Sequence, residues 1–272
     1  MSRKRWTLFL LIFFVALFPA FAGNRPLNII CDRWPPYQTV INNQVEGFST
    51  AIVKMVFQRM QVGIDKIHAY PWRRAIAMIE AGKVDALYSA NFTRERAGFA
   101  RYPDEPLVTT PWVMWVREGS GLRFRSMDDL EGKRIGLVNG YSYTRELWDY
   151  VNKHRNVEIV PNDELNFKKL HAGRVDYIVA DLRNGAYIVK HFGFDNLVPL
   201  MEQPIKFVGL YIIFNRKTVP QSSVVRFSEE LKALKKEAVF VEMHEKYFGE
   251  KPLDLPQEMV RPVPERRQEK DF

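Results

Sequence analysis

The sequence predicts an α/β protein of two similar lobes, each a mixed sheet flanked by helices, joined by a two-stranded hinge. Short apolar runs of strand length alternate with helix-like segments along most of the chain. A unit of turn and buried strand, AGKVDALYSA at 81–90, recurs as AGRVDYIVAD at 172–181. A chance match of two short units is the alternative. Two related copies predict two related lobes with a cleft between them.

Composition and charge narrow the class of protein. Of the 272 residues, 46% are hydrophobic and 26% are charged, which is typical of an ordered globular protein. The formal net charge is +8, but no dense Lys/Arg run with interleaved aromatic residues is present, so nucleic-acid binding is not expected. The one cysteine, Cys31, excludes an internal disulfide framework and a cysteine-based zinc site.

Residues 1–22 are typical of a secretory signal peptide. A basic stretch at 2–5 precedes an apolar run at 6–18, and Ala20-Phe21-Ala22 forms an A-x-A cleavage pattern. A retained anchor is the less favoured alternative, because the run is short for a membrane span of about 20 residues. The mature chain is expected in the periplasm if the source is Gram-negative.

Hydrophobic periodicity and capping residues predict the elements in order. Lobe 1 is expected at 23–109 plus 208–250 and lobe 2 at 110–207, with the hinge strands crossing near 108–111 and at 207–214. The tail at 251–272, rich in proline and charge, is expected to be disordered. The other predicted strands lie at 27–31, 64–70, 84–88, 133–138, 157–160 and within 172–181, and the predicted helices at 50–60, 72–80, 144–151, 165–171, 182–192 and 222–240.

Aromatic side chains are expected to form walls of the cleft. Prolines at 35 and 36 stiffen the loop that carries Trp34 and Tyr37, so these rings have little entropy left to lose on contact with a ligand. Packing on the lobe surface is the alternative for Trp34. Trp72, at the start of the helix 72–80, is expected to face Trp34 across a ligand.

Polar groups follow both copies of the repeated strand, where open α/β sheets hold ligands. The second copy ends in the carboxylate of Asp181, whereas the first ends in amide, hydroxyl and guanidinium groups. A cation on one lobe and an anion on the other suggest a cleft for a zwitterion. The groups after the first copy are Ser89, Asn91, Thr93, Arg94 and Arg96.

At Trp34-Pro35-Pro36-Tyr37, at Gly47-Phe48 and in the segments 82–96, 132–136 and 173–181, the sequence resembles the bacterial periplasmic solute-binding proteins of family 3. These are the polar amino-acid receptors of ABC importers. The resemblance covers about 27–248. It implies a two-lobed, periplasmic-binding-protein-like type II fold whose lobes close on a ligand.

The resemblance also implies roles for individual residues. Arg96, with Thr93 beside it, would clamp the α-carboxylate of the ligand, and Ser89 and Asn91 would assist. Ser142 and the backbone N–H groups of its loop would add donors from lobe 2. Asp181 would hold the α-ammonium, and the remaining side chains would form the walls of the side-chain pocket, namely Trp34, Tyr37 and Trp72.

Some positions depart from the family pattern. Ser49 stands where the family has an acid, and Tyr141 and Tyr143 flank Ser142 where it has small hydroxyl residues. The bulky rings would reshape the pocket. A standard amino acid is the expected ligand, but because these rings would reshape the pocket, an aromatic or modified amino acid, a small peptide or another carboxylate remain open.

The expected function is capture of a small zwitterion for a membrane permease of an ABC importer. A ligand-sensing subunit for a membrane receptor and a dehydratase-like enzyme on the same scaffold are the alternatives. No catalytic motif, metal site or cofactor site is predicted, because the histidines lack metal-ligand spacing and stand apart from the predicted cleft. A monomer is expected.

Overall fold

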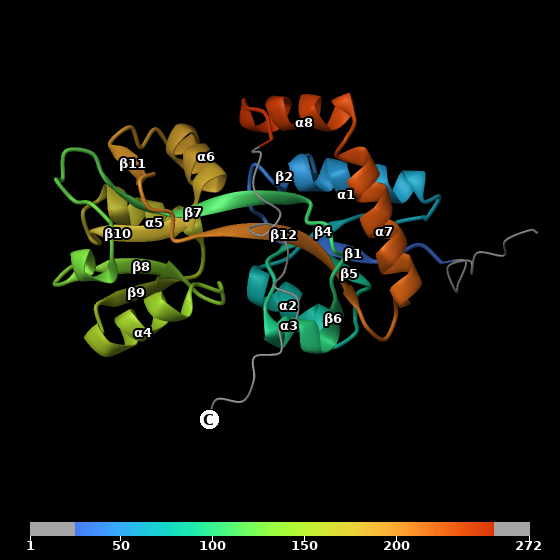
Figure 1. The fold of residues 1–272 in the computed structure, drawn as a ribbon, viewed down its shortest axis with the longest axis horizontal. Coiled ribbons are helices and arrows are strands. Elements are labelled where there is room, and N and C mark those ends of the chain that lie inside the picture. The colour runs from blue at the N-terminus through green and yellow to red at the C-terminus, as the bar shows by residue number, and fades with distance from the viewer. Residues whose placement is uncertain (1–24, 253–272) are drawn as a thin grey trace, which may run out of the picture.

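The computed structural model describes residues 25–252, so the signal peptide expected at 1–22 and nearly all of the tail expected at 251–272 lie outside the described residues. Figure 1 shows two bodies of helices and strands joined by two long strands, β7 (Val108–Arg117) and β12 (Lys206–Asn215). Among the described residues, no helix is long and apolar enough to cross a membrane.

The other strands are β1 (Ile29–Cys31), β2 (Thr39–Ile41), β3 (Gln44–Glu46), β4 (His68–Ala69), β5 (Ala86–Ala90), β6 (Ala100–Arg101), β8 (Ile135–Val138), β9 (Val157–Val160), β10 (Tyr177–Asp181) and β11 (Leu197–Leu200). One mixed sheet runs in the order β4-β1-β5-β12-β7-β10-β8-β9, with β6 added to β12 and β11 to β7. The pairs β1–β5 and β8–β10 are parallel, and β7–β12 is antiparallel. The crossing strands therefore occupy the middle of the sheet.

The helices are α1 (Phe48–Arg59), α2 (Trp72–Glu80), α3 (Arg94–Phe99), α4 (Arg145–His154), α5 (Asp163–His171), α6 (Leu182–Phe192), α7 (Gln221–Leu234) and α8 (Ala238–Phe248), with a 3₁₀ turn at Met127–Leu130. Helices α1, α2, α3, α7 and α8 surround β1, β4 and β5 in what we call the first body (Figure 1). Helices α4, α5 and α6 surround β8, β9 and β10 in the second body. The alternation of strands and helices predicted from the sequence is thus present in both.

Two predicted elements were wrong. The helix predicted at 222–240 ends at Leu234, and Glu237, with ψ near 152°, is extended before α8 begins. The break lets α8 turn, so that the Phe248 ring packs 4.6 Å from the ring of Phe48, while Phe227 of α7 is buried with its ring 5.1 Å from that of Phe57. The polar segment after the first repeated strand, where no helix was predicted, forms the short helix α3 around Arg96.

The sequence analysis also missed a hairpin formed by β2 and β3. Asn42 and Asn43 both have positive φ, at 48° and 60°, as a two-residue hairpin turn requires. Asparagine tolerates this conformation better than most residues, so the Asn-Asn pair between two short strands was a readable signal.

Gly47 fixes the loop that carries Trp34 and Tyr37. Its φ is 126°, and a Cβ at this position would lie 2.5 Å from the carbonyl oxygen of Tyr37. The close approach lets the N–H groups of Phe48 and Ser49, at the start of α1, donate to the carbonyls of Pro36 and Tyr37 at 3.1 and 2.9 Å. The helix start and the loop thereby hold each other in place.

Candidate functional site

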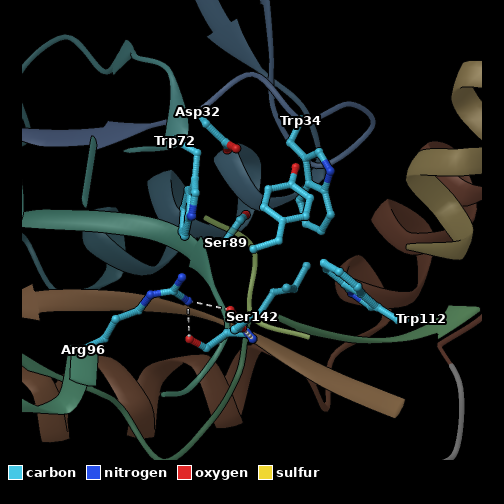
Figure 2. A pocket seen from close by; sticks show the side chains of 10 residues that line it. Asp32, Trp34, Trp72, Ser89, Arg96, Trp112 and Ser142 are labelled. Atoms are coloured by element: carbon cyan, nitrogen blue, oxygen red, sulfur yellow. Dashed lines mark hydrogen bonds between the residues drawn. The ribbon is translucent and has the colours of Figure 1, made fainter. Parts of the chain in front are cut away.

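A cavity of about 320 Å³, including its open mouth, lies where the two bodies and the crossing strands meet. Figure 2 shows Arg96 and Ser142 at one end, Asp32 at the other, and Trp72 and Trp34 on either side. Its lining combines charged, amide, hydroxyl and aromatic groups, which suits a small polar ligand. The lining residues are Asp32, Trp34, Trp72, Ser89, Asn91, Arg96, Trp112, Tyr141, Ser142 and Leu210.

Arg96 is a buried cation. Thr93 caps α3 by accepting a hydrogen bond from the Arg96 backbone N–H at 3.1 Å, and the side chain is only 6% exposed. Its Nη1 donates to Oδ1 and to the carbonyl oxygen of Asn91, at 2.6 and 3.0 Å, and the guanidinium lies 4.9 Å from the centre of the Trp72 ring. Burial lowers its pKa. No described carboxylate forms an ion pair with it, so its charge is available to an anionic ligand.

A second cation, Lys206, stands near Arg96 on the crossing strand β12. Its Nζ donates to the carbonyl oxygen of Ser142 and lies 5.0 Å from the centre of the Trp112 ring. Burial, and then the charge of Arg96, lower its pKa to about 8. The sequence analysis did not select Lys206, since a lysine at the start of an apolar strand gives no sign that it lies beside a cleft.

The loop of Ser142 meets the first body directly. Nδ2 of Asn91 donates to Oγ of Ser142, and the indole Nε1–H of Trp72 donates to the carbonyl oxygen of Gly140 at 3.1 Å. These contacts join segments that the sequence predicted on opposite sides of a ligand. Tyr141 lines the cavity, whereas Tyr143 is buried and accepts a hydrogen bond from the backbone N–H of Val138 at 2.8 Å.

Asp32 is held in a short buried chain of hydrogen bonds. Nε2 of Gln38 donates to its carboxylate at 2.7 Å, and Oγ of Ser89 donates to Oε1 of Gln38 at 2.7 Å. Ser89 has a φ of 63°, a left-handed backbone that is uncommon for residues other than glycine. Burial raises the pKa of Asp32 to about 6. An acidic group thus lies at the opposite end of the cavity from Arg96.

A larger groove of about 1180 Å³, including its open mouth, adjoins the cavity and shares Asp32, Trp34, Trp72 and Tyr141 with it. It also contains Asp163, the first residue of α5, which sequence reasoning did not select. Here the sequence offered only an acid near a helix start, which is common.

The structure places three of the predicted residues outside the cavity. Thr93 serves as the cap of α3. The hydroxyl of Tyr37 donates to both carboxylate oxygens of Asp181, at 3.0 and 3.1 Å, and both residues are almost completely buried. Asp181 also caps α6 by accepting from the backbone N–H of Asn184 at 2.8 Å. Arg96 and Asp181, which were expected to face one ligand cavity from its two sides, therefore do not share this cavity, because the carboxylate of Asp181 is bonded within the fold.

The six other predicted residues line the cavity, and they are Trp34, Trp72, Ser89, Asn91, Arg96 and Ser142. Within residues 25–252, no group of histidine, cysteine and acidic side chains is arranged to hold a metal ion.

Comparison with known proteins gives a family match and several relatives. Residues 27–250 match the family model of the bacterial extracellular solute-binding proteins, family 3. The ABC transporter arginine-binding protein 1 of Escherichia coli K12 is 28% identical over 153 residues. That match covers 54% of this chain, and the chain spans 59% of the relative's length.

Solved structures share the fold at lower sequence identity. A structure from work on glutathione import via GshT and the cystine ABC importer TcyBC of Streptococcus mutans has a TM-score of 0.73 at 20% identity, covering 88% of this chain and 100% of that one. A histidine kinase sensor domain with similarity to periplasmic binding proteins has a TM-score of 0.71 at 19% identity, covering 88% and 98%. At these identities the comparison shows the two-body α/β fold.

Proposed function

Because the chain belongs to the bacterial extracellular solute-binding proteins of family 3, we propose that it is a receptor that captures a small zwitterion between its two bodies. An amino acid is the expected ligand. We further propose that the signal peptide directs the protein to the periplasm and that it acts there as a monomer. It would deliver its ligand to the membrane permease of an ABC importer.

The buried guanidinium of Arg96 carries this proposal. A charge removed from water is unfavourable unless it is paired, and no described acid pairs with Arg96. A ligand carboxylate would supply the missing partner, and the planar guanidinium can bind both of its oxygens at once. Lys206, near Arg96, adds to the positive potential at this end of the cavity.

The contacts between the two bodies support capture by closure. Two indole N–H groups of the first body donate hydrogen bonds to the second body, one on either side of the cavity. Trp72 donates to the carbonyl oxygen of Gly140, and Trp34 donates to the carboxylate of Asp163. The two bodies are joined by the strands β7 and β12, which is the arrangement of a hinge. A ligand that contacts both bodies would favour the closed arrangement over an open one.

The test is a panel of the standard amino acids, screened by thermal shift and then measured by calorimetry. A binder raises the melting temperature by mass action. Arg96→Ala is expected to weaken binding of any carboxylate ligand by about 100-fold or more, because the loss of a buried charged partner is worth about 3 kcal/mol. Arg94→Ala, on the exposed side of the same helix, is the matched control. Equal affinity in the two variants would remove Arg96 from the site.

Two alternatives share this scaffold. The likeness to a histidine kinase sensor domain is one of fold, and a sensing role would appear as a ligand-dependent signalling defect in a deletion strain that still takes up the ligand.

A dehydratase-like activity would need an acid–base group, and Asp32 and Asp163 titrate nearer neutrality than ordinary acids. Recovery of every bound ligand unchanged after long incubation would exclude that activity.

A further inference from the structure

We propose that Asp163 binds a distal, side-chain cation of the ligand, so that the site favours amino acids whose side chain ends in an ammonium or guanidinium group. The inference rests on the proposed function, because it names a second subsite of the same cleft. It gives the ligand's side-chain cation a partner that the sequence did not predict, at the start of α5 in the second body.

Asp163 has an unused acceptor. It is only 4% exposed, and its Oδ2 accepts from the indole Nε1–H of Trp34 at 3.0 Å and from the hydroxyl of Tyr141 at 2.8 Å. Its Oδ1 is buried and has no hydrogen-bond partner among the described residues. A buried acceptor without a donor is unfavourable by about 1–3 kcal/mol, and more when it is charged. A cationic N–H donor from a ligand would remove that penalty.

The subsite lies within reach of the same ligand. The groove that contains Asp163 shares four lining residues with the cavity that contains Arg96, so the two spaces are parts of one cleft. Trp34 and Trp72 line both. Aromatic faces also attract cations, so these walls suit a positively charged group as well as an aliphatic stem.

The charges of the cleft are separated along its length. Arg96 stands at one end, and Asp32 lies at the other, in the portion shared with Asp163. The charge of Lys206 interacts with that of Arg96. Arg33 is the cation that lines the groove, but it is 60% exposed and lies 3.8 Å from Glu164. No described cation forms an ion pair with Asp32 or Asp163. Burial raises the pKa of Asp163 to about 7, and a bound cation would lower it again.

Asp181 is not the better candidate. The hydroxyl of Tyr37 and the backbone N–H of Asn184 already donate to its carboxylate, and it lines neither the cavity nor the groove. An ammonium group would have to displace Tyr37 to reach it. Asp163 keeps one carboxylate oxygen, Oδ1, without a hydrogen-bond donor among the described residues.

Calorimetry with four probes at about pH 8, above the pKa of Asp163, tests the inference. L-Arginine and L-lysine carry a distal cation, and L-glutamine and L-norleucine are neutral there. The wild type is expected to bind at least one cationic probe about 10-fold or more tightly than both neutral ones. Asp163→Asn, which keeps an acceptor for Trp34 and Tyr141, is expected to weaken that binding about 10- to 100-fold and to change the neutral probes by less than about 3-fold.

Asp195→Asn neutralises an exposed acid of the second body and serves as the matched control. A purely structural role for Asp163 would weaken all probes equally, so the ratio between cationic and neutral probes is the decisive readout. Wild-type protein that binds neutral probes as tightly as cationic ones would overturn the inference and leave the receptor function intact. Absence of binding by all four probes and by the wider amino-acid panel would overturn the proposed function, and this inference with it.

Discussion

The two copies of the repeated unit end in different chemistry. The first copy places Ser89 in the cavity at the end of β5, and the next residue after the copy, Asn91, contacts both Arg96 and Ser142. The second copy delivers Asp181 at the end of β10, where it caps α6 and accepts from Tyr37 of the other body. One local pattern therefore lines the cavity in the first body, and in the second body it connects the two bodies to each other. Position at the end of a strand does not by itself determine which role a side chain takes.

The largest expected effect comes from comparing Asp181→Ala, at the end of the second copy, with a variant just after the first copy. Asp181→Ala takes away a helix cap and leaves the buried Tyr37 hydroxyl without its acceptor. We expect the free energy of unfolding to fall by about 2–4 kcal/mol. Asn91→Ala, at the residue that directly follows the first copy, should cost about 1–2 kcal/mol, because the Arg96 guanidinium loses the side-chain acceptor and keeps the Asn91 carbonyl, and it should weaken ligand binding about 10-fold.

Urea denaturation and calorimetry on the same two variants separate the outcomes. If Asp181→Ala kept full stability and lost its ligand, Asp181 would belong to the site, as the family resemblance implies. The conclusion that the two copies end in different roles would then be wrong.

The next effect concerns pH and the acids of the cleft. Burial raises the pKa of Asp163 to about 7 and that of Asp32 to about 6, so the folded protein holds protons that the unfolded chain releases near pH 4. Stability of the ligand-free protein should therefore fall as pH rises from about 4 to about 7. Trp34 and Tyr141 face Asp163 as neutral donors, while the charges of Asp181 and Asp32 add to its shift.

The test is to measure the melting temperature of the wild type across this pH range. Asp163→Asn should make the melting temperature less dependent on pH, because asparagine does not titrate. A wild-type melting temperature that rises between about pH 4 and pH 7 would show that the folded protein ionises these acids with little loss of stability, and would contradict the expectation.

The smallest effect is expected for Trp72→Phe. The change keeps an aromatic wall and removes the indole N–H that donates to the Gly140 carbonyl across the cavity. One neutral hydrogen bond is worth about 1 kcal/mol, so affinity should drop no more than about 10-fold. Faster ligand release in stopped-flow experiments, with an unchanged association rate, would place the loss in the closed arrangement.

The sequence predicted the elements of the fold better than the partners of buried side chains. Periodicity located most helices and strands because each depends on nearby residues, and the one long helix failed at Glu237, where packing of α8 decides the break. The cavity residues Arg96 and Ser142 follow predicted elements. Tyr37 and Asp181 meet across 144 residues of chain, and no local pattern records that contact.

Asp163 and Lys206 escaped sequence reasoning for a related reason. One begins a helix and the other begins a crossing strand, and each is an ordinary charged residue in its own segment. Their significance comes from the way the second body and β12 bring them to a cleft formed largely by other segments.

Trp34, Trp72 and Trp112 all line the cavity, and none of them is far from a charged side chain. Indole emission depends on the polarity and charge around the ring. Occupancy of the cleft should therefore change the intrinsic fluorescence of the unlabelled protein, which would allow ligands to be titrated optically in dilute solution without a coupled transporter or a dye.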